Sequence, residues 1–160
     1  MDYWIKSAGT ADDPVPANWY SWGRNSLGGF GDPTMFSRRP AVRQDDRLVF
    51  YAVGSAARFK VGRIFAVVEV SSEPEPSGHE RWPWQVFSRM LIPGPRLPTC
   101  PSIDDIDVAL TSLRRHSHIT LTDDQGQEAA RLIDNAAQRA GTLGHCYKGP
   151  PPPAGFSPGQ

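Results

Sequence analysis

The sequence predicts a single loop-rich α+β domain in which strands come first and helices follow. A chain of 160 residues suits one compact domain, which would bury roughly 70% of its unfolded surface. A hydrophobic content of 39%, with 10% aromatic residues, is too rich for a disordered protein. The 15 Gly and 16 Pro residues indicate many turns.

The strands are predicted from runs of β-branched and aromatic residues. A short opening strand covers residues 3–7. Residues 47–53 and 61–70 are two apolar runs joined by a turn-prone segment, a pattern that predicts an antiparallel hairpin. A third strand over 84–92 is closed by a Pro-Gly-Pro stretch. Such nearly continuous apolar runs suit strands that are buried on both faces or curled into a barrel.

Two helices are predicted after the strands. Ser102 with Asp105 three residues later marks the start of the first, and Thr122 with Gln125 marks the start of the second. The second helix has an alanine-rich stripe that allows close packing on a sheet and should end at Gly141. The apolar stripe of the first helix consists of Ile106, Ala109, Leu110 and Leu113.

The composition changes after residue 146, where a Pro/Gly-rich stretch predicts a flexible tail over 147–160 behind a domain over 1–146. Cys100 and Cys146 form no C-x-x-C pair, so we expect no disulfide scaffold, metal site or redox cofactor. The chain starts without a leader pattern, and no apolar run approaches the roughly 20 residues of a membrane span. We therefore expect a cytoplasmic monomer with no membrane partner.

The charges balance at 17 Lys+Arg against 17 Asp+Glu, but they are unevenly distributed. Residues 37–64 carry seven cations against two acids and net +5, whereas residues 65–80 and 100–128 are acidic. A local basic surface of this kind can bind phosphates even in a neutral chain, although preferred codon usage would also account for the many arginines. The candidates for phosphate or backbone contact are Arg38, Arg39, Arg43, Arg58 and Lys60.

Catalytic signatures are thin, because the sequence has no nucleophile elbow, H-E-x-x-H pair, P-loop or dinucleotide fingerprint. His116 and His118 have no cysteine or carboxylate at metal-site spacing, and we expect them to end a helix, where the helix dipole favours a cation. The acidic cluster of Asp104, Asp105 and Asp107 falls in the first turn of a predicted helix, which accounts for it without a metal. The sequence therefore favours no catalytic residue and no cofactor.

The five tryptophans gather in three places, and two aromatic faces can sandwich a flat heterocycle. Trp19, Trp22 and Trp82 are candidates for contact with a ligand. In the alternative, these three cap the ends of a barrel while Trp4 and Trp84 lie in its core.

Four segments together resemble the EVE domain family and span roughly residues 3–140. Residues 3–7, Tyr-Trp-Ile-Lys-Ser, are similar to its Tyr-Trp-Leu-x-Lys-Ser start. The hairpin from Asp46 to Val70 is similar to its Gly-Asp-x-hydrophobic-x-Phe-Tyr strand and the Val-Gly strand that follows. Residues 81–86 resemble its Trp-x-x-Val segment, and residues 114–122 resemble its Arg-x-x-Ser-His-Ile-x-Leu-Thr segment.

The resemblance implies a PUA-like fold related to YTH and ASCH domains, a small curved β-barrel of about five to six mostly antiparallel strands with flanking helices. Relatives hold a modified base in an aromatic cage. Carried over to this chain, that implies polar contacts from Lys6 and Ser7, with a cage formed by Trp19 or Trp22 and by Trp82. The usual Lys-Ser-Glu-Pro is Lys-Ser-Ala-Gly here, and the usual Trp-x-Gly-Val-Arg-Asn is absent, which leaves the ligand open.

The leading hypothesis is a non-enzymatic module that binds a nucleic acid or nucleotide and recognises a modified base. Trp22 and Trp82 would stack on the base, and Ser7 and Asn25 would bond its edge. One alternative is a PUA-type RNA-binding module without base selectivity. The other is a small hydrolase of nucleotides or modified nucleosides, with an acid or base among Lys6, Asp45 and Asp46.

Overall fold

A computed structural model describes residues 1–9, 14–21, 33–53, 62–108 and 118–140 of the chain. These residues form eight strands, three 3-10 helices and one α-helix. In chain order they are β1 (Tyr3–Ala8), η1 (Trp19–Ser21), β2 (Thr34–Phe36), β3 (Arg47–Ala52), β4 (Arg63–Val70), β5 (Glu75–Pro76), β6 (Trp84–Val86), β7 (Ser88–Pro93), η2 (Leu97–Thr99), η3 (Ile103–Ile106), β8 (His118–Leu121) and α2 (Asp123–Ala140).

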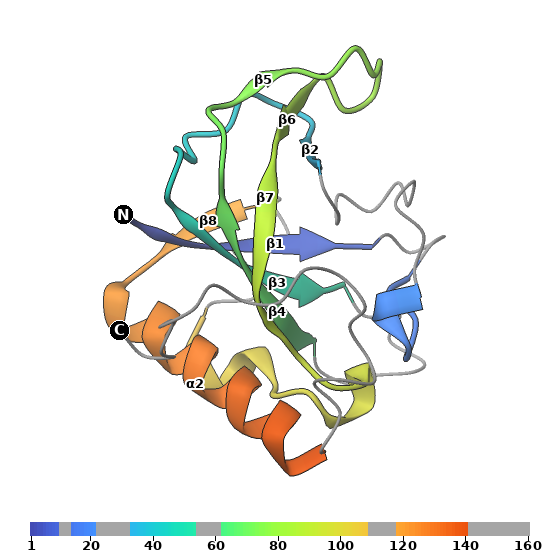
Figure 1. Cartoon of the computed structure of the whole chain (residues 1–160), viewed down its shortest axis with the longest axis vertical. Coiled ribbons are helices and arrows are strands. Elements are labelled where there is room, and N and C mark those ends of the chain that lie inside the picture. Colours follow the sequence, from blue (N-terminus) through green and yellow to red (C-terminus); the bar gives the residue numbers. More distant parts are fainter. Residues whose placement is uncertain (10–13, 22–32, 54–61, 109–117, 141–160) are drawn as a thin grey trace.

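The larger sheet has five strands in the order β7-β4-β3-β1-β8. β3 and β4 pair antiparallel, which confirms the predicted hairpin. β1 pairs parallel with β3, from Tyr3 opposite Arg47 to Ala8 opposite Ala52, and antiparallel with β8 on its other side. The first strand of the chain therefore lies inside the sheet, as Figure 1 shows.

The smaller sheet contains β2, β6 and β5 in that order and lies above the larger one in Figure 1. The predicted single strand over 84–92 is wrong, because the chain divides at Phe87, which is 39% exposed, into β6 and β7 of different sheets. β7 and β8 are the two edges of the larger sheet, and no described ladder joins them. The chain is thus an α+β domain with two open sheets, in place of the closed barrel that the resemblance implied.

Apolar side chains cover both faces of the larger sheet, as the continuous apolar runs predicted. On one face, Val49 and Ile64 of the hairpin pack against Ala129, Ala130 and Ile133 of α2. The opposite face has its own core, which includes Leu48, Phe50, Phe65, Phe36 and Val86. This core contains residues of both sheets. Helix α2 covers the other face of the larger sheet (Figure 1).

The two predicted helix starts are both capped as expected. The Thr122 hydroxyl accepts the N–H of Gln125 at 3.1 Å, while the Gln125 side chain accepts the N–H of Thr122 at 3.0 Å. Ser102 and Asp105 form the same reciprocal pair at the start of η3. That element ends after four residues at Asp107, whose φ of 56° is left-handed, and the rest of its predicted stripe lies outside the described residues.

Gly126, near the start of α2, allows the helix to approach β1. A Cβ at this position would lie 2.1 Å from Cγ of Tyr3. The Tyr3 ring has little room to move, because its hydroxyl accepts a hydrogen bond from Nη1 of Arg47 at 2.8 Å and the same guanidinium lies over its face. Gly126 therefore sets the distance between α2 and the sheet.

Gly126→Ala is expected to lower the free energy of unfolding by about 1–3 kcal/mol, because the new methyl group overlaps a fixed ring. At an unobstructed helix position the same change would stabilise by up to about 1 kcal/mol. Urea denaturation measures the difference. Gln127→Ala, at the next helix position, is the control and should change stability by less than about 0.5 kcal/mol. A Gly126→Ala protein as stable as the wild type would contradict the close contact.

Candidate functional site

The carboxylate of Asp46 is buried, 4% exposed, and accepts hydrogen bonds at both oxygens. Its Oδ1 accepts the backbone N–H of Asp2 at 2.9 Å. Its Oδ2 accepts the indole N–H of Trp4 at 3.0 Å and the backbone N–H of Arg43 at 2.9 Å. Because a buried carboxylate needs such donors in place of water, Asp46 holds together the start of β1, the loop before β3 and the Trp4 ring.

Three rings meet on the sheet face opposite α2, and we call them the ring layer: Trp4, Phe36 and His118. The centroid of the His118 ring lies 5.7 Å from that of Trp4 and 5.1 Å from that of Phe36. Strand geometry explains the meeting, because Trp4 and Lys6 share one face of β1 and Lys6 stands opposite His118 in the β1–β8 ladder. Phe36 comes from the end of β2 and so brings the smaller sheet to the same place.

The ammonium of Lys6 lies beneath this layer. The residue is 1% exposed, and Nζ is 5.2 Å from the centroid of the Phe36 ring. Nζ donates to the carbonyl of Ser7 at 3.0 Å, and no described carboxylate forms an ion pair with it. Burial lowers the pKa of Lys6 to about 8. An ammonium has three N–H donors, and here one of them is bonded to a carbonyl while the charge lies near an aromatic ring. A further N–H can therefore donate to an acceptor of a ligand.

Trp84 begins β6 of the smaller sheet and Trp82 lies in the turn before it, and an arginine lies over each ring. The guanidinium carbon of Arg39 lies 5.3 Å from the Trp84 ring, and that of Arg81 lies 5.4 Å from the Trp82 ring. The indole N–H of Trp82 is buried without an acceptor among the described residues. Trp84 stands opposite Phe36 in the β2–β6 ladder, so the Arg39–Trp84 pair adjoins the ring layer.

The predicted ligand contacts are only partly brought together. Trp19 lies in the core instead of in a cage: it is 1% exposed and its indole N–H donates to the Pro95 carbonyl at 2.8 Å, so neither ring face is open. Ser7 follows Lys6 on β1, so the two side chains point to opposite faces of the sheet. Trp82 is half-buried, whereas Trp22 and Asn25 lie outside the described residues.

The predicted phosphate contacts differ in their availability. Arg38 and Arg39 are exposed. Arg43 is also exposed, but its Nε pairs with Oε2 of Glu73 at 3.1 Å. Arg58 and Lys60 fall outside the described ranges.

The ring layer is not predicted by the sequence. Trp4 packs against the core, as the alternative interpretation of the tryptophans predicts, but no sequence pattern singles out Phe36. The prediction that His118 ends a helix is wrong, because His118 begins strand β8. One signal was available: His118 to Leu121 directly precedes the capping pair at Thr122, a short run of the kind that forms a strand before a helix. His116 lies outside the described residues.

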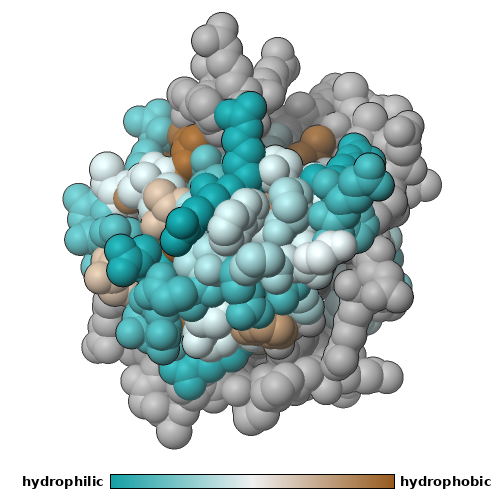
Figure 2. Space-filling view, turned by 90° about the horizontal axis from the view of Figure 1, so that it is seen from above, coloured by the Kyte–Doolittle hydropathy of each residue, from teal (hydrophilic) through white to brown (hydrophobic). Residues whose placement is uncertain are grey.

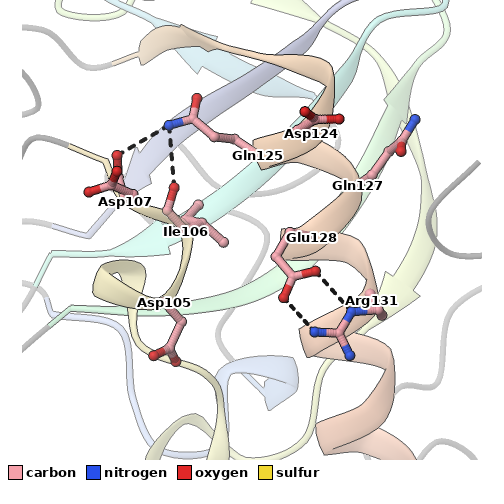
Figure 3. A pocket seen from close by; sticks show the side chains of 8 residues that line it. All are labelled: Asp105, Ile106, Asp107, Asp124, Gln125, Gln127, Glu128 and Arg131. Carbon is pink, nitrogen blue, oxygen red and sulfur yellow. Dashed lines mark hydrogen bonds and ion pairs between the residues drawn. The ribbon is translucent and has the colours of Figure 1, made fainter.

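A shallow groove of about 540 Å³ runs between η3 and α2 (Figure 3). Several of its polar groups already serve the fold. Asp105 caps η3, the Gln125 amide donates to the carbonyls of Ile106 and Asp107, and Glu128 pairs with Arg131. In the described part of the chain, no three His, Cys, Asp or Glu side chains are placed to hold a metal.

No helix among the described residues is long and apolar enough to cross a membrane. No protein-family model matches the chain, and no curated protein matches it. Among solved structures, a hypothetical protein from Leishmania major is 14% identical, with a TM-score of 0.51 over 88% of this chain and 97% of that one. Rpa0253 from Rhodopseudomonas palustris is 16% identical over 87% and 94% of the two chains, with a TM-score of 0.48. The likeness to the Leishmania protein shows a shared fold and carries no function.

Asp46→Asn is expected to lower the free energy of unfolding by about 3 kcal/mol or more. The amide offers one acceptor oxygen in place of two and turns its own N–H groups toward buried donors. Denaturant titration followed by tryptophan fluorescence would measure it. Asp45→Asn is the matched control: it removes the same charge next door, at an exposed residue whose φ of 74° suits asparagine, and should cost less than about 0.5 kcal/mol. Equal losses in the two variants would argue against the Asp46 hydrogen bonds.

Lys6→Met is expected to stabilise the protein at pH 7. Burial lowers the pKa of Lys6 from 10.5 to about 8, so the folded state binds this proton less tightly than the unfolded state. Below pH 8 both states are charged and the full cost of burial remains. As the pH rises from about 8 to 10.5, the folded state loses the proton first, and wild-type stability rises.

The unfolding free energy of Lys6→Met should exceed that of the wild type by up to about 3 kcal/mol at pH 7, and the gap should close towards pH 10.5. Urea denaturation at a series of pH values measures both. Arg96→Met, which removes a cation from an exposed residue, should show no such dependence on pH. A Lys6→Met protein less stable than the wild type at pH 7 would mean that the ammonium stabilises the fold.

Proposed function

We propose that this chain is a non-enzymatic module that binds a nucleic acid or nucleotide by holding one base, modified at its edge, beside the ring layer and Lys6. The observation that carries the proposal is the buried Lys6 ammonium, which has one carbonyl acceptor and no carboxylate partner among the described residues. A buried charge with such sparse compensation costs stability, so its presence is better explained by a ligand than by the fold.

The chemistry of the layer suits a base. Stacking on an aromatic ring contributes about 1–3 kcal/mol per base, and Trp4 and His118 are only half-buried, so part of each residue is open to solvent. Ring nitrogens and carbonyl oxygens on the base edge are acceptors, which is what an ammonium requires. Because Lys6 is 1% exposed, binding includes a local rearrangement that admits an acceptor atom to Nζ.

The resemblance to EVE domains supports the same location, because the polar contacts that it implies for a bound base include Lys6. We therefore propose an EVE-type module of the PUA-like class. The proposed cage differs from the one that the sequence suggested, because Trp4 and His118 take the place of Trp19. Trp82 is kept as a residue at the edge of the site, since it lies two residues before Trp84, which stands opposite Phe36.

A hydrolase of nucleotides or modified nucleosides is the second candidate, and one observation favours it. Lys6, whose pKa burial lowers to about 8, stands opposite His118, so two ionisable groups converge at the ring layer. Asp46 suits catalysis less, because both of its oxygens already accept hydrogen bonds. Chromatography of a nucleotide panel after incubation with the protein separates the candidates, because a binding module returns every nucleotide intact.

Titration with short oligonucleotides that each carry one modified base, at low salt, tests the binding function. We expect one modified base to change the tryptophan fluorescence. The oligonucleotide that carries it should bind at least about tenfold more tightly than the same oligonucleotide with the unmodified base. Lys6→Met should weaken that affinity by about 10- to 100-fold, the range expected for a hydrogen bond from a charged donor. Arg96→Met, an equal loss of charge, should bind as the wild type does.

Two results would count against the proposal. One is unchanged fluorescence across the whole panel. The other is Lys6→Met protein that binds every base as tightly as the wild type. Because this variant is expected to be stable at pH 7, its binding can be compared directly with that of the wild type. Equal affinity for all bases with a steep dependence on salt would favour the PUA-type RNA-binding module instead.

A further inference from the structure

Three chain segments leave the smaller sheet at the same end. β2 ends at Phe36 and β6 begins at Trp84, and these two residues stand opposite each other in an antiparallel ladder. β5 ends at Pro76, which also stands opposite Trp84. Arg38 and Arg39, just after β2, therefore lie at the same end of the sheet as the turn from Ser77 to Trp82. We call this region the arginine end: Arg38, Arg39, Arg81, Trp82 and Trp84.

The arginines of this end are available to an anion. Arg38, Arg39 and Arg81 are exposed, and none pairs with a described carboxylate. The nearby acids are partly engaged, because Glu73 pairs with Arg43 and Glu75 accepts a hydrogen bond from Gln85, while Glu80 is exposed beside Arg81. Figure 2, which looks down on the molecule from the side of the smaller sheet, shows a mostly hydrophilic described surface.

The arginine side chains are also held in place. Arg39 lies over the Trp84 ring and Arg81 lies over the Trp82 ring, so each guanidinium is pre-organised by its indole. The outer face of a stacked guanidinium can take a base, and its edge can bind phosphate in two places.

The turn that carries Arg81 and Trp82 is built from its own hydrogen bonds. Ser77 donates to the Trp82 carbonyl, and its hydroxyl accepts the N–H of His79 at 3.0 Å. Nδ1 of His79 accepts the N–H groups of Arg81 and Trp82, each at 3.2 Å. The indole N–H of Trp82 stays buried without a described acceptor, which leaves a donor for a ligand oxygen.

We propose that the arginine end binds the sugar–phosphate backbone of a single-stranded nucleic acid whose recognised base lies at the ring layer. The inference rests on the proposed function and names its partner: a strand of several nucleotides, not a free base or mononucleotide. Phe36 joins the two places, because its ring contacts Lys6 and His118 and Arg38 follows two residues later, within about 7 Å of chain. A single strand fits because a base held at the ring layer must be unstacked.

Four probes that share one base test this: thymidine, its 5′-monophosphate, and the oligodeoxythymidylate trimer and hexamer. We expect the hexamer to bind at least about tenfold more tightly than the monophosphate. For the hexamer, a plot of the logarithm of the association constant against the logarithm of the salt concentration should have a slope of about −2. Arg38, Arg39 and Arg81 would each contact one phosphate, and each such contact contributes about −0.7 to the slope.

Arg39→Gln and Arg81→Gln should each weaken hexamer binding by about three- to tenfold, reduce the slope by about 0.7 and leave thymidine binding unchanged. Arg131→Gln is the matched control, because it removes the same charge from α2, where Arg131 pairs with Glu128, and should have no effect. Hexamer and monophosphate of equal affinity would overturn the inference, as would equal effects of Arg131→Gln and Arg39→Gln. Binding of hexaglutamate as tight as that of the hexamer would also overturn the inference, because it would indicate an acidic peptide partner.

The same series separates the two proposals. If Lys6→Met changes no affinity for any modified base while the arginine variants still weaken hexamer binding, the base site is wrong and the arginine end is supported. If Lys6→Met abolishes base selectivity while the hexamer binds no better than the monophosphate, the base site is supported and the arginine end is wrong.

Discussion

The buried carboxylate of Asp46 is the constraint on which the rest of the site depends. It holds two backbone segments and the Trp4 indole at once, so the start of β1 cannot shift along β3 without breaking a hydrogen bond to a buried charge. The register of β1 then places Lys6 opposite His118. Each later contact of the site, including Phe36 on His118 and Trp84 beside Phe36, builds on that register.

Lys6 shows how stability and binding oppose each other here. An apolar residue at this position would suit the surrounding core, since Phe36 and Phe50 lie on the same face. The charge instead lies among rings, where burial lowers the pKa of Lys6 to about 8, a pattern found where a side chain is kept for a ligand. The same low-dielectric surroundings that penalise the ammonium strengthen any hydrogen bond that it donates.

Local signals in the sequence account for much of the fold. The hairpin of β3 and β4 follows from β-branched runs, and the start of α2 follows from Thr122 and Gln125. The division at Phe87 could not be predicted, because both halves of the run have strand composition and only the two sheets decide where the chain bends. The ring layer was equally hidden, because the pairing of β1 with β8 is a property of topology and not of local sequence.

The pairing of β1 with β8 also has a kinetic consequence. Lys6 is made long before His118, so a chain leaving the ribosome lacks one side of the site until β8 has emerged and docked on the edge of β1. Until then β1 has one unpaired strand edge, and this edge includes Lys6, which is buried in the folded protein. A ligand held between the two strands would therefore favour chains in which β8 has docked on β1 over chains that lack β8, so that occupancy of the site would report that this pairing has formed.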